Sequence, residues 1–215
     1  MAGVVAETCL PASTRTLLTP GVPMTSPLTP PGFRSGSSIS REVDGLRYRR
    51  AVSVLLRALE QSDLDMLDGA DAPFLDFGPR APRTKVPAAG LDDSGALAVV
   101  EDEGGGLAGF VSWHWQQWGP NAASRCPNIG IWIRACARGR GVGQQAQRQL
   151  AELFFRHTAV NRVEAHTDIE NVAEQRALVA AGFHREGLIR GAQWRDGAYR
   201  DGYLYAITRS DVQAN

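Results

Sequence analysis

The order of hydrophobic and polar positions predicts strands through the middle of the chain. Valine and leucine occupy alternate positions of residues 52–56, which predicts a first strand. Residues 96–100 and 107–115 flank a turn with three consecutive glycines and predict an antiparallel hairpin. This hairpin leads into an apolar run at residues 128–133, which predicts a buried central strand.

Helical spacing begins directly after that strand and a glycine turn. Ala146, Leu150 and Phe154 recur at intervals of four, which predicts an amphipathic helix. A shorter helix is predicted at residues 62–67, with Ser62 as its N-cap and acidic residues in its first turn.

The last part of the chain alternates strand and helix. Residues 162–168 predict a strand, and the helix that follows has Asn171 as N-cap, Glu174 as its capping partner and Gly182 at its end. An Asp-Gly pair joins two long strands within residues 183–208. Their aromatic side chains are expected to pack across the strands. Together these elements predict a mixed α/β domain.

Composition limits the partners that this domain can have. Proline, serine and threonine dominate residues 1–45, which predicts a disordered tail before a folded domain at residues 46–210. Lys+Arg and Asp+Glu both number 23, so we expect no nucleic acid and no membrane as a partner. No apolar run approaches the roughly 18 residues that cross a bilayer, and the three cysteines show no C-x-x-C spacing. We therefore expect a cytoplasmic protein without a metal.

The glycine turn after the central strand is the main candidate for a binding site. Gly139, Gly141 and Gly143 lack the Cβ atoms that would keep a ligand away from the backbone. Successive N–H groups at a helix N-terminus favour an anion, and phosphate fits that geometry. Arg138 and Arg140 add charged donors suited to phosphate oxygens.

Three other interpretations of the same turn are weighed against phosphate binding. A Walker loop requires Lys and then Ser or Thr after its last glycine, where this chain has Gln144 and Gln145. A dinucleotide fingerprint requires G-x-G-x-x-G in an early βαβ unit, whereas this G-x-G-x-G run comes late. Glycine that only turns the chain is the remaining alternative.

The spelling Arg-x-x-Gly-x-Gly at Arg138, Gly141 and Gly143 resembles the acetyl-coenzyme A loop of the GCN5-related N-acetyltransferase (GNAT) family. The resemblance covers roughly residues 50–208. Within the family, the chain looks like the branch that acetylates ribosomal-protein N-termini (RimJ/RimL-like). Its further motifs lie at residues 161–168, 171–176, 181–183 and 194–197. The implied fold is a mixed, mostly antiparallel central sheet with one splayed parallel strand pair, flanked by helices.

The resemblance also implies which residues contact the coenzyme. The pantetheine arm would lie between the central strand and residues 162–168 and bond to the strand backbone. The implied coenzyme contacts are Ile131, Trp132, Ile133, Arg138, Gly139, Arg140, Gly141, Val142, Gly143, Gln144, Asn171 and Arg176.

Two departures from the family affect catalysis. Hydroxyl side chains that relatives place at the positions of Glu174 and Leu178 are missing, which leaves the general acid unassigned.

An amine acceptor must lose a proton before it attacks, so a base is needed. His114 is the first candidate, with Glu164, Asp168 and Glu174 as rivals. The tryptophans at 113, 115 and 118 are candidate walls of an acceptor pocket, and residues 73–87 are expected to form a loop over it.

The resemblance implies an acetyl-CoA-dependent N-acetyltransferase that uses acetyl-CoA as co-substrate and acts directly on a primary amine, as a monomer or homodimer. The acceptor is a protein or peptide N-terminus or a small amine such as an antibiotic or polyamine. A non-catalytic acyl-CoA-binding module and a proline-tail scaffold are the alternatives.

Overall fold

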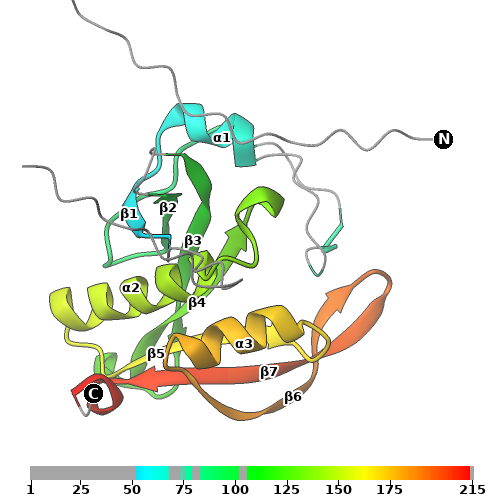
Figure 1. The fold of residues 1–215 in the computed structure, drawn as a ribbon. Coiled ribbons are helices and arrows are strands. Elements are labelled where there is room, and N and C mark those ends of the chain that lie inside the picture. Colours follow the sequence, from blue (N-terminus) through cyan, green and yellow to red (C-terminus); the bar gives the residue numbers. More distant parts are fainter. Residues whose placement is uncertain (1–51, 68–73, 75, 79–82, 102–105, 214–215) are drawn as a thin grey trace, which may run out of the picture. The chain divides into compact units, whose positions relative to one another are not determined.

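The computed structural model describes residues 52–67, 74, 76–78, 83–101 and 106–213 (Figure 1). The predicted tail at residues 1–45 and the expected start of the domain at residue 46 lie outside the described residues.

The described residues form a seven-stranded sheet in the order β1-β2-β3-β4-β5-β7-β6. Neighbouring strands are antiparallel except for β4 and β5, which are parallel. This confirms the predicted mixed sheet with one parallel pair. The strands are β1 (Val54–Ala58), β2 (Gly95–Glu101), β3 (Leu107–Gln117), β4 (Arg125–Ile133), β5 (Arg162–Asp168), β6 (His184–Arg195) and β7 (Ala198–Thr208).

The first helix, α1 (Gln61–Leu67), begins one residue before the predicted cap. Ser62 therefore lies inside the first turn, and its prediction as N-cap is wrong. The backbone N–H of Glu60 instead donates to the Asp63 carboxylate at 2.8 Å, and the Asp63 N–H donates to the Glu60 carbonyl at 3.0 Å. Arg57 of β1 binds both oxygens of that carboxylate at 2.6 and 2.9 Å, which ties the helix to the sheet.

Two longer helices, α2 (Val142–His157) and α3 (Val172–Ala180), lie side by side on one face of the sheet (Figure 1). The predicted stripe of Ala146, Leu150 and Phe154 on α2 is fully buried. It packs on inward side chains of the sheet and forms the main core with them. A smaller core, on the other face, joins α1 to side chains of β2, β3 and β4.

The β6–β7 hairpin turns at Asp196 and Gly197, as the Asp-Gly pair predicted. Both residues have positive φ, 47° and 70°, which matches the turn type that twists with its strands. Trp194 and Tyr199 face each other across the strands with their rings 4.9 Å apart. A short final helix, α4 (Arg209–Gln213), follows β7.

The parallel pair separates soon after it begins. Within the described residues, β4 and β5 pair at Asn128 with Glu164 and at Ile129 with Ala165, and not beyond. The rest of β4 keeps its antiparallel partner β3 as far as Ile133. The chain therefore opens a split between β4 and β5, and α2 begins at its far end.

Replacing Phe154 by alanine is expected to lower the free energy of unfolding by about 3–5 kcal/mol. Phe154 is fully buried, with its ring 5.5 Å from that of Trp113 and 5.9 Å from that of Trp115. Denaturant titration would measure the loss, with the partly buried neighbour Leu153→Ala as control. Equal losses in the two variants would contradict this account of the core.

Candidate active site

The glycine loop connects β4 to α2 through a short 3-10 turn at Ala135–Ala137. Gly139 and Gly141 have φ of 71° and 79°, a left-handed conformation that favours glycine. Gly141 directly precedes α2 and offers no side chain to cap it. The helix's own hydrogen bonds start where the Gln145 N–H donates to the Gly141 carbonyl at 3.1 Å. The N–H groups of residues 142–144 therefore have no partner within the helix and suit an anion.

The two loop arginines differ in their placement. Arg138 lines the cavity at the loop, and its Nε donates to the Ile133 carbonyl at 2.8 Å. The guanidinium of Arg140 forms an ion pair with Glu101 at the end of β2. Arg140 is absent from the described residues that line the cavity. This placement does not support its prediction as a coenzyme contact, because the ion pair draws its charge to the sheet.

Hydrogen bonding along β4 decides which of its backbone groups face the split. The Arg134 N–H donates to the Ala108 carbonyl of β3 at 2.8 Å. Because residues of an antiparallel strand alternate in direction, Trp132 also directs its backbone groups to β3, whereas Ile131 and Ile133 direct theirs to the split. The structure thus places two of the three predicted backbone contacts at the open edge and turns the Trp132 backbone away.

Helix α3 contributes Asn171 and Glu174 to the same space. The Asn171 side chain accepts a hydrogen bond from the Glu174 N–H at 3.2 Å, which confirms it as N-cap. The Glu174 carboxyl hydrogen-bonds to Gln147 of α2. Burial raises the pKa of Glu174 to about 7, and the hydrogen bond from Gln147 opposes this rise.

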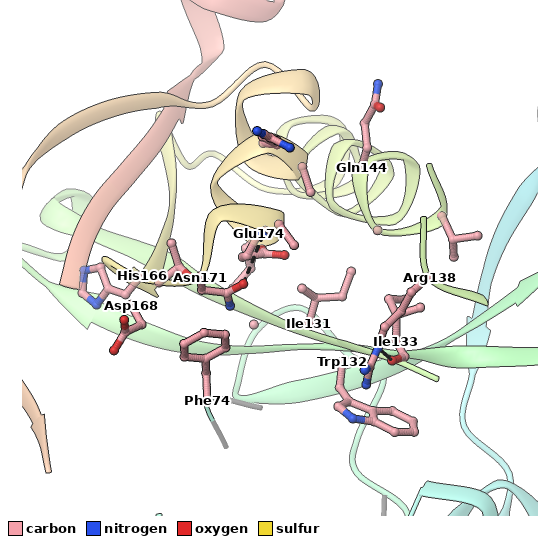
Figure 2. A pocket seen from close by; sticks show the side chains of 18 of the residues that line it. Phe74, Ile131, Trp132, Ile133, Arg138, Gln144, His166, Asp168, Asn171 and Glu174 are labelled. Atoms are coloured by element: carbon pink, nitrogen blue, oxygen red, sulfur yellow. Dashed lines mark hydrogen bonds between the residues drawn. The ribbon is translucent and has the colours of Figure 1, made fainter. Parts of the chain in front are cut away.

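These elements surround a cavity of about 980 Å³ that follows the split (Figure 2). Figure 2 shows Ile131 and Trp132 leaving opposite sides of β4, with Asn171 and Glu174 above them. The volume suits a ligand the size of a coenzyme arm and a small acceptor. Of the predicted coenzyme contacts, Ile131, Trp132, Ile133, Arg138, Gly139, Gly141, Val142, Gly143, Gln144, Asn171 and Arg176 line it.

A second group of side chains lines the cavity from the face opposite α2 and α3. His114 of β3 stands directly across from Asn128 of β4, and Ser112 stands across from Gly130. His166 of β5 also lines the cavity. Partial burial lowers its pKa and the charge of His114 lowers it further, while Glu164 opposes both. The two imidazoles therefore both line the cavity, from strands that lie on either side of β4.

Glu164 is not in the cavity. Its side chain is fully buried and accepts hydrogen bonds from Trp118 Nε1 at 2.7 Å and from Arg162. The carboxylate is held by a structural ion pair, which does not support its prediction as a catalytic base.

The three tryptophans do not form an acceptor pocket. Trp113 and Trp115 pack on Phe154 beneath α2, and Trp118 bonds to Glu164. The sequence already carried a signal for Trp113 and Trp115. Residues two apart in a strand share a face, so these two must point away from the face that His114 occupies.

Sequence reasoning missed Arg195, which joins residues that line one end of the cavity. Buried in β6, it forms ion pairs with Asp168 of β5 and with Asp76, the latter at 2.9 Å. Its guanidinium also lies 5.6 and 5.9 Å from the ring centres of Phe74 and Phe77. These two aromatic residues line the cavity, as expected for the loop at residues 73–87, of which residues 73, 75 and 79–82 lie outside the described residues. No local pattern links Arg195 to a loop 119 residues earlier.

No cluster of three or more metal-ligating side chains occurs in the described part of the chain. Among those residues, we find no helix with the length and hydrophobicity to cross a membrane.

Comparisons with known proteins agree with this geometry. Residues 53–184, from β1 to the start of β6, match the family model described as "Acetyltransferase (GNAT) domain". The chain is 30% identical over 83 residues to the probable N-acetyltransferase YjcK of Bacillus subtilis (strain 168), a match that covers 39% of this chain and 46% of that protein. The chain spans less than half the length of the curated relatives it matches.

Solved structures share the fold. Mycobacterium smegmatis RimJ in complex with CoA-disulfide is 25% identical, with a TM-score of 0.50 over 56% of this chain and 55% of that one. An acetyltransferase (GNAT family) from Bacillus anthracis is 18% identical, with a TM-score of 0.60 over 75% and 98% of the two chains. From its sequence match and its fold, the chain belongs to the GNAT acetyltransferase family.

Proposed function

We propose that the chain is an acetyl-CoA-dependent N-acetyltransferase that transfers an acetyl group directly to a primary amine in a ternary complex. One observation carries this proposal: the open edge of β4 leads directly to the uncapped first turn of α2, and both line one cavity. The N-acetyltransferase names of the curated relatives support it, and the likeness to RimJ favours the branch that acts on protein N-termini.

The coenzyme would bind along that edge. Its diphosphate suits the N–H groups of residues 142–144, with the Arg138 side chain at the same loop. Its pantetheine arm would extend β4 through the backbone groups of Ile131 and the N–H of Ile133, whose carbonyl already accepts from Arg138. This places the thioester toward Asn128 and Ile129, where the two strands meet.

Transfer moves two protons as well as the acetyl group. The amine nitrogen attacks the thioester carbonyl, a C–N bond forms and the C–S bond breaks, the amine loses a proton and the thiolate gains one. We assign the amine's proton to the imidazoles of His114 and His166, on the acceptor face. The lowered pKa keeps His166 neutral at pH 7 and able to accept a proton.

Glu174 is the candidate proton donor to the thiolate. It lies on α3, on the same side of the sheet as the glycine loop, and lines the cavity. A carboxyl group with a pKa of about 7 keeps its proton in a good part of the molecules at neutral pH. A thiol titrates near 8.5, so transfer from Glu174 to the thiolate is downhill. Glu174 thereby takes the place of the hydroxyl groups that relatives carry.

Direct transfer is favoured over a covalent acyl-enzyme. Neither Cys126 nor Cys136, the cysteines within the described residues, lines the cavity. Burial, together with the charge of Glu164, raises the pKa of the Cys126 thiol to about 12, so it is not a thiolate at neutral pH.

Replacing Gly141 by glutamate is expected to weaken coenzyme A binding by about 3 kcal/mol, roughly a hundredfold. The new carboxylate would stand beside the diphosphate, on a residue whose φ of 79° also disfavours a side chain. Isothermal titration calorimetry would measure the affinity, with Gly90→Glu, at an exposed glycine outside the cavity, as a matched charge control. An unchanged affinity in the Gly141 variant would refute the assigned phosphate site.

Replacing Glu174 by glutamine is expected to lower kcat about a hundredfold and to change the pH dependence of stability. Because the folded pKa of about 7 lies above the ordinary 4.5, the folded protein binds more protons between these values. Wild-type stability therefore falls as pH rises through this window, and the Gln variant is spared that loss. At pH 8 the variant gains up to about 3 kcal/mol relative to wild type, and at pH 5 much less.

Steady-state kinetics and denaturant titrations at the two pH values would test this role. The control is Glu170→Gln, at an exposed acid on the preceding turn and outside the cavity. A stability difference that is the same at pH 5 and pH 8, or a kcat equal to that of wild type, would remove Glu174 from the mechanism.

A further inference from the structure

Asn128 has a place in the cavity that the proposed chemistry does not use. It lies on β4 opposite His114 of β3 and beside Glu164 of β5, one residue before the last pair, Ile129 with Ala165, that joins β4 and β5. Its side chain is 5% exposed and lines the cavity. Asn128 and His114 share one face of the sheet, because directly opposed residues of antiparallel strands point the same way.

The amide nitrogen of Asn128 is buried without a hydrogen-bond partner among the described residues. Buried polar groups of folded proteins are nearly always paired, because an unpaired donor loses its bonds to water and gains nothing. An amide nitrogen can only donate, so the group that satisfies it must be an acceptor atom. The neighbouring Glu164 also has a buried carboxylate oxygen, Oε2, without a partner, but the structure shows no hydrogen bond between the two side chains. Asn128 lines the cavity and Glu164 does not, which points to an oxygen of a bound ligand.

The charges that line the cavity argue against a polycationic ligand. Among the described residues, its carboxyl groups belong to Asp168 and Glu174. Asp168 is buried in an ion pair with Arg195, and burial favours the protonated form of Glu174. The remaining charged or titratable side chains are two histidines and two arginines. Among these residues, a polyamine would therefore find only the partly ionised Glu174 as an uncompensated carboxylate.

We propose that Asn128 selects the acceptor: its amide nitrogen donates to an oxygen that the acceptor carries next to its reacting amine. The acceptor class is thus an α-amino carbonyl compound, such as a peptide N-terminus or an amino-acid amide, and not a polyamine. This rests on the proposed acetyl transfer, in which the neighbouring His114 receives the amine's proton. The side-by-side placement of these two residues matches an amine and a carbonyl separated by one carbon.

The test compares three amines with wild type and with Asn128→Leu. The amines are alanyl-alaninamide, its analogue with a methylene group in place of the first carbonyl, and spermidine. Wild type is expected to show a kcat/KM at least about tenfold higher for the peptide than for the methylene analogue. Asn128→Leu is expected to reduce that ratio to near one by losing activity on the peptide alone.

A second variant, Asn128→Asp, keeps the shape and replaces the donor by a charged acceptor. It is expected to lose the peptide preference and to gain relative activity on spermidine. Asn161→Leu, at an exposed position outside the cavity, is the matched control and should leave all three ratios unchanged. Thermal melts check folding; Asn128→Leu should melt no lower than wild type, because it removes an unpaired buried donor.

Other outcomes separate this inference from the proposed function. Equal use of peptide and methylene analogue by wild type, or a preference that survives in Asn128→Leu, would overturn the role of Asn128 and leave acetyl transfer intact. A uniform fall in kcat for every amine would assign Asn128 to the acyl carbonyl and contradict acceptor selection. Coenzyme A binding without turnover of any amine would overturn the transferase itself, and this inference with it.

Discussion

The loss of a partner along one edge of β4 is the constraint on which the rest of the site depends. After Ile129 the strand continues beside β3 but leaves β5, so the backbone of Ile131 and Ile133 faces a cavity in place of a neighbouring strand. Exposed strand edges tend to pair with another chain. Here the edge lies in a cavity, which allows a single extended ligand to bind along it. The split also leads that ligand to the glycine loop, since α2 starts where β4 ends.

The two faces of the sheet divide the chemistry between them. On one face, α2 and α3 cover the main core and bring the first-turn amides of α2 and the carboxyl of Glu174 to the split. On the other face, His114, Asn128 and His166 remain open to the cavity. Strand alternation alone produces this division, and it places a proton donor and the candidate bases on opposite sides of the proposed reacting carbon. The half-buried carboxyl of Glu174 costs stability above pH 7, as groups held ready for catalysis often do.

Much of the fold and the local structure of the glycine loop could be predicted from the sequence, because these parts depend on local signals. The strand, glycine turn and helix around Gly141 are contiguous, as are the Asn171 cap and the Asp-Gly hairpin. The site predictions that the structure does not support depend on contacts between residues far apart in the chain. Arg140 pairs with Glu101, and Trp118 donates to Glu164 across 46 residues of sequence. The Arg195 clamp on Asp168 and Asp76 likewise joins three separate segments, and no spacing rule predicts such pairs.

Amide hydrogen exchange along β4, followed by NMR with and without saturating acetyl-CoA, tests the central claim most directly. The account predicts that the amides of Ile131 and Ile133 exchange more slowly when the coenzyme is bound, because they gain hydrogen bonds across the split. The amide of Trp132, already directed to β3, should change little. Coenzyme binding that leaves Ile131 and Ile133 unprotected would contradict the claim that the open edge of β4 holds the ligand.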